Sequence, residues 1–190
     1  MKKKYLKFAF LLVALLAIYV YYPSQEFQAK KGEVKGLTQY VSSDYQVIAV
    51  EDGDTISVAM NGKKEKIRFI GVDTPETKDP RKAVQCFGKN ASEYTKQKIN
   101  QGAVRLESDE LNTNRDRYNR LLRYVYLPDG TLLNTQIIKD GYGFAYTSFP
   151  FTKKDEFKRI ENNAREQNKG LWAVCQPSRN AYGGFTSNPE

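Results

Sequence analysis

Three short runs of alternating or β-branched apolar residues lie close together between residues 45 and 72, and they constrain the fold more than any other feature. The runs are Tyr45–Glu51, Thr55–Met60 and Glu65–Val72. Runs of this length and pattern are typical of half-buried strands. Asp52-Gly53-Asp54 and Asn61-Gly62 separate them with the residue types of tight turns, so the segment predicts three strands joined in sequence.

Two further strands and three helices are predicted downstream. The strands are Val104–Glu107 and Leu121–Leu127. The helices are Asn90–Gln101, a short helix through Leu133, Ile137 and Ile138 that stops at Gly141, and Lys154–Asn168. The fold class is therefore α+β. Five strands with appended helices fit a small closed barrel of the OB type, but an α+β sandwich explains the same pattern.

The N-terminus combines a basic cluster with an uncharged apolar run from Phe8 to Tyr22. The cluster consists of Lys2, Lys3, Lys4 and Lys7. This pattern is typical of a membrane anchor or a signal peptide. Tyr21, Tyr22 and Pro23 offer no small residues for cleavage, which favours an uncleaved anchor over residues 1–22, in contact with the membrane through residues 5–22.

A cleaved signal peptide and a buried helix of the soluble domain remain alternatives to the anchor. The basic flank predicts that the N-terminus lies on the inner side of the cell membrane and the rest of the chain outside the cell. If the segment is cleaved, the protein is expected to be secreted. Residues 23–43 are polar without a sustained period and predict a flexible linker. Residues 176–190, rich in Gly, Ser, Asn and Pro, predict a disordered tail. A globular domain is therefore expected over residues 44–175.

The composition excludes several kinds of chemistry, because the chain has no histidine and only two cysteines. A Ser-His-Asp triad, a His-liganded zinc site and a four-thiolate metal site are all impossible. The 30 Lys and Arg residues against 22 Asp and Glu give a net charge of +8, which favours an anionic partner such as nucleic acid or a membrane surface. Half of that excess, +4, lies within residues 1–33.

Three short segments are rich in the residue types that carry out hydrolytic chemistry. They are Asp52–Thr55, Arg68–Thr77 and Asn114–Arg120. Taken alone, the first is typical of an Asp-Gly turn and the third of a solvated loop. Taken together, the three supply the parts of a metal-assisted phosphodiesterase.

The chemistry of such an enzyme assigns a role to each residue type. Asp54, Asp73 and the Thr74 carbonyl offer oxygen ligands to a hard cation such as Ca²⁺. Glu76 offers a carboxylate that orients or deprotonates the attacking water. Planar guanidinium forks for the phosphate oxygens come from Arg68 and Arg120. None of these roles requires histidine.

Four motifs occur in the order and spacing of one known family. They are Asp-Gly-Asp-Thr, Val-Asp-Thr-Pro-Glu-Thr, Asp-Arg-Tyr-x-Arg and a late Gly-Leu-Trp. From about Tyr45 to Trp172 the chain resembles the staphylococcal nuclease (thermonuclease) family, and the first two motifs together are highly specific. The resemblance implies a five-stranded OB-type barrel with three helices. It also implies Ca²⁺-dependent hydrolysis of DNA and RNA to 3′-phosphate products.

By position, the resemblance implies three groups of site residues. The catalytic group is Arg68, Glu76 and Arg120. The calcium ligands are Asp54, Asp73 and Thr74, with Asp52 as a supporting carboxylate. The substrate-binding group is Arg117 and Tyr118, which hold a terminal phosphate of the nucleotide, and Tyr146, which stacks on a base.

The sequence departs from the family pattern at two places. Asn119 replaces the glycine between Tyr118 and Arg120, and Asn is among the few residues that tolerate a positive φ. The aromatic pair for base stacking is also altered, because the second aromatic, Phe149, is displaced by one residue. Tyr146 alone is therefore assigned, and the displacement leaves base preference open.

Cys86 and Cys175 bracket most of the domain. For a domain outside the cytoplasm, a disulfide between them is expected, and two unpaired thiols are the alternative. The expected partners are DNA and RNA as substrates and the membrane through the N-terminal segment. No protein partner is predicted, and the expected state is a monomer.

The main alternative to an enzyme is a catalytically weak module that binds nucleic acid or another protein. The two functions differ in whether the carboxylates and both arginines are present, and all of them are present here. A polybasic membrane-surface protein explains the lysines but leaves Asp54, Asp73 and Glu76 without a role. The sequence therefore favours the nuclease.

Overall fold

The computed structural model describes residues 44–77, 83–100, 102–181 and 183–189. The predicted anchor over residues 1–22 and the linker over residues 23–43 lie outside the described residues. Among the residues that are described, no helix is long and apolar enough to span a bilayer.

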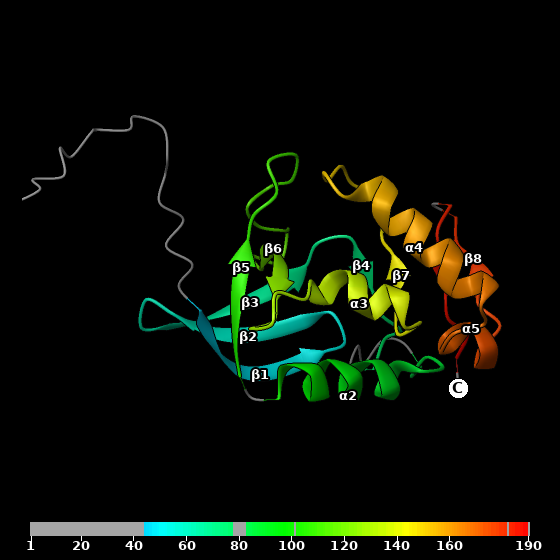
Figure 1. The fold of residues 1–190 in the computed structure, drawn as a ribbon, viewed down its shortest axis with the longest axis horizontal. Helices are drawn as coiled ribbons and strands as arrows, with labels where there is room; N and C mark the ends of the chain where they lie inside the picture. The colour runs from blue at the N-terminus through cyan, green and yellow to red at the C-terminus, as the bar shows by residue number, and fades with distance from the viewer. Residues whose placement is uncertain (1–43, 78–82, 101, 182, 190) are drawn as a thin grey trace, which may run out of the picture. The chain divides into compact units, whose positions relative to one another are not determined.

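Five strands of the described chain close into a barrel in the order β1-β2-β3-β6-β5 (Figure 1). They are β1 Tyr45–Asp52, β2 Thr55–Met60, β3 Lys63–Phe69, β5 Ala103–Glu107 and β6 Leu121–Tyr126. Neighbouring strands pair antiparallel except β3 and β6, which run parallel. The closed barrel is confirmed, and the α+β sandwich is ruled out.

The third strand is shorter at its end than predicted, because the chain turns at Gly71. This glycine has φ of 70°, a left-handed conformation that does not continue a strand. The chain resumes as β4, Val72–Asp73, which leaves the barrel and pairs antiparallel with β7, Phe144–Ala145. The turn therefore moves Asp73 and the residues after it from the barrel wall to its rim.

Three helices lie close to their predicted positions: α2 Gly88–Ile99, α3 Leu133–Lys139 and α4 Lys154–Glu166. A fourth, short helix, α5 Leu171–Val174, was not predicted. Helix α3 contacts strand β6 of the barrel and both α2 and α4, while α2 also packs directly against β1 (Figure 1). The predicted apolar face of α3 is fully buried at Leu133, Ile137 and Ile138.

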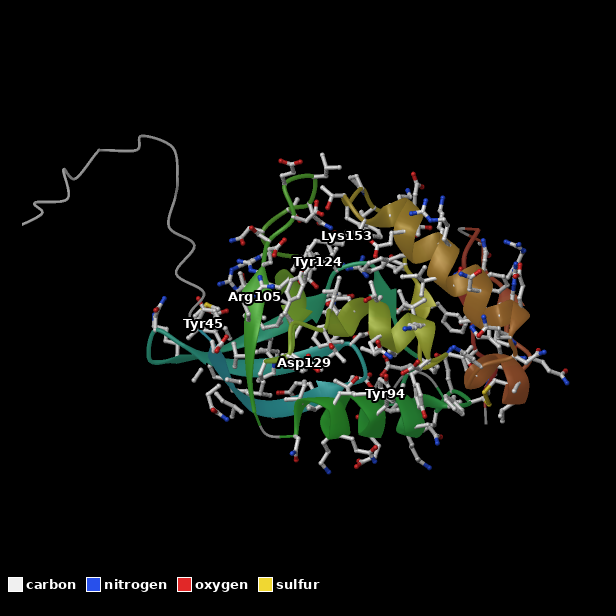
Figure 2. All side chains as sticks on the ribbon, viewed as in Figure 1. Tyr45, Tyr94, Arg105, Tyr124, Asp129 and Lys153 are labelled. Atoms are coloured by element: carbon white, nitrogen blue, oxygen red, sulfur yellow. A yellow bond between two sulfur atoms is a disulfide. The ribbon has the colours of Figure 1, made fainter. Side chains whose placement is uncertain are left out.

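One hydrophobic cluster fills the barrel and continues under α3 and α4. Ile56, Val58 and Ile67 from the barrel are fully buried together with Phe157 from α4. Removing this apolar surface from water is the main favourable term of folding. Tyr124 of β6 is also buried in the cluster and lies near the start of α4 (Figure 2).

The C-terminal segment is ordered, so the predicted disordered tail over residues 176–190 is wrong for its described part. Strands β8, Ser178–Arg179, and β9, Phe185–Thr186, form a hairpin. The Phe185 ring packs edge-on against Trp172 with the ring centroids 4.9 Å apart. A single aromatic anchor in a polar segment escapes a prediction based on composition, because its packing partners lie elsewhere in the chain.

A disulfide joins Cys86, which precedes α2, to Cys175, which ends α5. Both cysteines belong to a second, smaller apolar cluster with Trp172 and Phe185. The disulfide and this cluster together hold the C-terminal segment against the beginning of α2.

Candidate functional site

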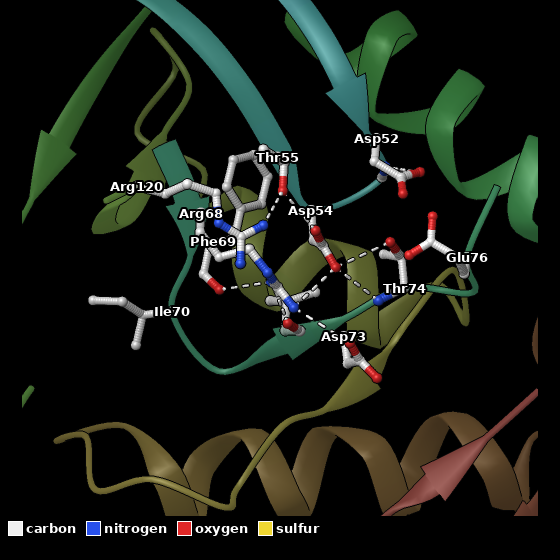
Figure 3. A network of polar contacts seen from close by, with 12 residues as sticks. Asp52, Asp54, Thr55, Arg68, Phe69, Ile70, Asp73, Thr74, Glu76 and Arg120 are labelled. Atoms are coloured by element: carbon white, nitrogen blue, oxygen red, sulfur yellow. Dashed lines mark hydrogen bonds and ion pairs between the residues drawn. The ribbon is translucent and has the colours of Figure 1, made fainter. Parts of the chain in front are cut away.

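Asp54 is the buried carboxylate at the centre of the site (Figure 3). Its Oδ1 accepts a hydrogen bond from Thr55 Oγ1 at 2.9 Å. Its Oδ2 accepts from the Thr74 amide at 3.0 Å and from Thr74 Oγ1 at 3.1 Å. A buried carboxylate needs such donors. The two bonds from Thr74 also connect the turn between β1 and β2 to the segment that follows β4.

Arg68, the last residue but one of β3, connects two of the site carboxylates. Its Nη2 lies 3.2 Å from Asp54 Oδ2 and 3.3 Å from Asp73 Oδ1. Its Nη1 donates to the Val72 carbonyl at 2.6 Å. The guanidinium group is thus held by groups on both sides, and Asp54 and Asp73 face the same small volume.

Arg120 lies beside Arg68 and points toward Thr55 (Figure 3). Its Nε donates to Asp116 Oδ2 at 2.7 Å, and its Nη1 lies 3.5 Å from Thr55 Oγ1. Thr55 in turn donates to Asp54, so both arginines converge on the one buried carboxylate. Asp116 also accepts the Arg120 backbone N–H at 2.9 Å, and it thereby fixes the arginine at both backbone and side chain.

Glu76 lies at the rim of the site, just beyond Thr74 (Figure 3). Its backbone N–H donates to Gln85 Oε1 at 2.8 Å, and its Oε1 accepts from the Thr77 amide at 3.0 Å. The Thr77 hydroxyl donates to Asp52 Oδ1 at 3.1 Å. Thr77 therefore links the Glu76 carboxylate to the supporting carboxylate on β1.

Asp52 is a site carboxylate whose surroundings disfavour its ionised form. Burial, together with the neighbouring carboxylates of Asp54 and Glu76, raises the pKa of Asp52 to about 6. Hydrogen bonds from the Gly53 N–H and the Thr77 hydroxyl oppose the rise. A nearby cation would favour the ionised form of Asp52.

The donor set fits a hard cation that keeps several water ligands. No three His, Cys, Asp or Glu side chains of the described residues come close enough to form a metal cage by themselves. Asp54 and Asp73 nevertheless share one guanidinium nitrogen, and the Thr74 backbone follows directly. All of these donors are oxygens, which is the ligand type that Ca²⁺ and Mg²⁺ take in proteins.

Arg117 and Tyr118 form an exposed pair next to Arg120. Arg117 Nη2 donates to the Tyr118 hydroxyl at 2.8 Å, and the Arg120 guanidinium lies 5.4 Å from the centroid of the Tyr118 ring. Asn119 between them has φ of 64°, as expected for a residue that stands in for glycine. The turn therefore presents one phenol and two guanidinium groups on the same side.

Tyr146 follows β7 and is exposed to solvent over 36% of its surface. Phe149, which the sequence left unassigned, is 58% exposed, and the centroids of the two rings lie 5.8 Å apart. The structure thus brings both aromatics together on the surface despite the displacement in sequence.

Three residues that hold the site together were not singled out from the sequence. They are Thr55, Gln85 and Asp116. Asp116 carries a usable signal, because it lies four residues before an arginine of opposite charge. Gln85 carries none, because its hydrogen bond to Glu76 crosses nine residues without a pattern.

Comparison with known proteins identifies relatives of the chain. A family described as "Staphylococcal nuclease homologue" matches residues 66–174. "Thermonuclease" of Staphylococcus hyicus is 38% identical over 166 residues, which cover 86% of this chain and 95% of that protein. "Endonuclease YncB" of Bacillus subtilis is 43% identical over 124 residues, 64% of this chain and 58% of that protein.

A second Bacillus subtilis protein, "SPbeta prophage-derived endonuclease YokF", is 41% identical over 133 residues, which cover 69% of this chain and 43% of that protein. The chain therefore spans about half the length of the two Bacillus relatives, whereas it spans nearly all of the Staphylococcus hyicus protein. The matched residues include the segment from Arg68 to Arg120.

Proposed function

The chain belongs to the staphylococcal nuclease family, and from this premise we propose that it is a Ca²⁺-dependent nuclease that hydrolyses DNA and RNA to 3′-phosphate products. The observation that carries the proposal is the convergence of Arg68 and Arg120 on Asp54, with the Glu76 carboxylate at the rim. This arrangement surrounds an anionic substrate with donors while keeping a base beside them.

The metal would be held by Asp54, Asp73 and the Thr74 carbonyl, with Asp52 as a supporting carboxylate. When bound, Ca²⁺ supplies positive charge next to the phosphate oxygens and so stabilises the charge that builds up during hydrolysis. The close approach of the Asp54 and Asp73 carboxylates to one Arg68 nitrogen supports this assignment.

The protein residues carry out the remaining steps. Glu76 accepts the proton of the attacking water at its carboxylate, and the water oxygen bonds to phosphorus. The bond from phosphorus to the 5′ oxygen breaks, and the released 5′ oxygen takes a proton from solvent to become a hydroxyl. Arg68 and Arg120 donate hydrogen bonds to the phosphate oxygens, which gain charge in the transition state. Their fixed hydrogen bonds to Val72 and Asp116 keep both guanidinium groups oriented before substrate arrives.

Substrate binding beyond the scissile phosphate rests on three residues. Arg117 and Tyr118 would hold a terminal phosphate, which their adjacent donor groups support. Tyr146 would stack on a base, with Phe149 beside it. Stacking of this kind contributes about 1–3 kcal/mol per base without strong sequence preference. The membrane attachment expected from residues 1–22 stays a prediction.

The test is a cleavage assay on single-stranded DNA and RNA in which Ca²⁺ is titrated and then removed with a chelator. We expect cleavage to require Ca²⁺ and the products to carry 3′-phosphates. Substitution Glu76→Gln should lower kcat by about 10²–10⁴-fold, and Arg120→Ala by at least about 10²-fold.

Matched controls are Glu166→Gln and Lys139→Ala, which remove a charge from exposed positions on α4 and α3. Both should cleave at the wild-type rate. Full cleavage in excess chelator would contradict the metal requirement, and near wild-type rates from Glu76→Gln would contradict its role. Binding of nucleic acid without cleavage under any condition would favour the alternative, a catalytically weak binding module.

A further inference from the structure

Gln85 forms hydrogen bonds with both the backbone N–H and the backbone carbonyl of Glu76. The Gln85 Oε1 accepts from the Glu76 N–H at 2.8 Å, and the Gln85 N–H donates to the Glu76 carbonyl at 2.9 Å. The backbone of the proposed base is therefore clamped at two points by one residue.

The other face of Gln85 is occupied by the C-terminal segment. Gln85 Nε2 donates to the Ser187 carbonyl at 3.0 Å, and a backbone bridge pairs Gln85 antiparallel with Pro189. The next residue, Cys86, donates its N–H to the Asn188 carbonyl at 2.8 Å. One side chain thus joins the loop that carries Glu76 to a segment about one hundred residues away.

The C-terminal segment is itself fixed at several points. Ser187 is 3% exposed and its hydroxyl donates to the Cys86 carbonyl at 2.8 Å. Phe185 is packed against Trp172, and the disulfide between Cys86 and Cys175 closes the same region. Residues 185–189 are therefore held at several points where they meet the Nε2 end of the Gln85 amide, whose Oε1 end bonds Glu76.

The start of α2 packs closely on the residues around Glu76. A Cβ added at Gly88 would lie 2.6 Å from Thr77 Cγ2 and 3.0 Å from the Glu76 carbonyl. The helix backbone therefore packs directly on the residues around the base. Precise placement of a catalytic group matters, because a shift of about 1 Å can cost about 10²-fold in rate.

We propose that Gln85 is a positioning residue for Glu76, and that the C-terminal segment over residues 185–189 is part of the active-site architecture because it supports Gln85 from behind. The inference deepens the proposed function and rests on Glu76 as the base. The Gln85 side chain bonds the Glu76 backbone N–H and the Ser187 carbonyl, so its proposed contribution is to the placement of Glu76.

The first test is Gln85→Ala, with Gln167→Ala, at an exposed position beyond α4, as the matched control. We expect Gln85→Ala to lower kcat by about tenfold or more with KM unchanged, because the arginines that bind phosphate are untouched. The control should match the wild type. The assay is run well below the thermal midpoint of each variant, so that unfolded protein does not contribute.

A double-mutant cycle separates positioning from general loss of structure. In the Glu76→Gln background, where the base is already absent, Gln85→Ala should lower kcat no further. An equal fold-loss in both backgrounds would overturn the positioning role. A wild-type kcat for Gln85→Ala in an otherwise active enzyme would also overturn it.

The contribution of the C-terminal segment is tested by Phe185→Ala, which removes its aromatic anchor and leaves Gln85 in place. The readout is hydrogen exchange of the Glu76 amide by NMR, which does not depend on cleavage. Exchange should rise in both Gln85→Ala and Phe185→Ala, with a parallel fall in kcat for the second variant. Unchanged exchange and kcat in folded Phe185→Ala would overturn the role of the segment.

Failure of the inference and failure of the proposed function are distinguishable in these experiments. If the wild-type protein does not cleave nucleic acid, the proposed function is wrong, and the exchange of the Glu76 amide still reports whether Gln85 holds it. If the wild type cleaves and Glu76→Gln is inactive while Gln85→Ala is normal, only the inference is wrong.

Discussion

At Gly53 the turn between β1 and β2 has no room for a side chain. A Cβ at this position would lie 2.8 Å from Thr74 Oγ1 and 2.9 Å from Thr74 Cβ. The Gly53 carbonyl also accepts a hydrogen bond from Thr95 of α2 at 2.6 Å, so the turn cannot move away. The close contact is what lets Thr74 reach Asp54.

Gly53→Ala should therefore reduce activity more than it reduces stability. The added methyl group pushes Thr74 away from Asp54 and disturbs the proposed metal ligands, while the overpacking costs about 1–3 kcal/mol. The expected result is a large fall in kcat in a protein that still unfolds cooperatively. Cleavage assays and denaturant unfolding measure the two effects.

Gly62→Ala is the matched control for this substitution. Gly62 lies in another hairpin turn with φ of 73°, and a Cβ there meets nothing within 4 Å. The Gly62→Ala variant should lose stability because of backbone strain but keep the wild-type kcat. Equal activity in the Gly53 and Gly62 variants would contradict the role given to the Gly53–Thr74 contact.

Among the elements, the connection from β5 to β6 is tied to the entry of α4 by Asp109. This buried carboxylate accepts hydrogen bonds from the Tyr124 hydroxyl and from both the amide and the hydroxyl of Thr152. Burial raises the pKa of Asp109, but the hydrogen bonds from Thr152 and Tyr124 outweigh it, so the pKa is lowered overall. The ionised form is thus the one that joins β6 to α4.

We expect Asp109→Asn to lower the free energy of unfolding by about 2 kcal/mol at pH 7, because the amide turns an acceptor into a donor that faces other donors. A lowered pKa stabilises the fold at pH values above the ordinary value of 3.8 and loses this effect as the pH falls through the folded pKa. The difference between wild type and variant should therefore shrink below pH 4.

Urea unfolding at pH 7 and at pH 3 measures this difference. Glu110→Gln, at the exposed position next to Asp109, is the matched control and should leave the midpoint unchanged at pH 7. A difference between wild type and Asp109→Asn that stays constant between the two pH values would show that the ionised carboxylate is not responsible.

At the scale of the whole molecule, the disulfide links the beginning of α2 to the end of α5 across a sequence separation of 89 residues. It closes most of the described domain into one loop. Replacing both cysteines, Cys86→Ser with Cys175→Ser, should lower the free energy of unfolding by about 4–5 kcal/mol in the chain-entropy model.

Denaturant unfolding of the wild type and the double variant, each with and without a reductant, tests this expectation. Reductant should destabilise the wild type and leave the variant unchanged. A variant as stable as the oxidised wild type would mean that the disulfide does not constrain the unfolded chain. Serine is the matched replacement because it preserves the size of the side chain.

The local elements were largely predictable. Strand β2, Thr55–Met60, has the predicted bounds, and β6 and α4 start at the predicted residues, because alternation, helical spacing and turn residues are properties of neighbouring positions. The failures have a common cause. Strands β4 and β7 have two residues each and pair with each other across a long stretch of sequence. The two strands of the C-terminal hairpin are equally short, and a single aromatic ring anchors them, so no local pattern reveals any of these strands.

The candidate site divides in the same way. Asp54, Arg68 and Arg120 stand out in the sequence because their charged motifs are dense and ordered. The sequence does not show how these residues are arranged, because the hydrogen bonds by which Thr55 joins Arg120 to Asp54 form only in the folded chain. Gln85 is the extreme case, because it connects Glu76 to Ser187 and has no motif of its own.

The sequence by itself determined the kind of chemistry available to this protein: no histidine, several carboxylates and two well-placed arginines, in motifs whose order indicates the family. Only the tertiary structure decided that the strands close into a barrel through the parallel pairing of β3 with β6, and that Gln85 bonds both Glu76 and the C-terminal segment. The physical reason is range: residue types and local periods are written in neighbouring positions, whereas closure and support depend on contacts between residues that are distant in the chain.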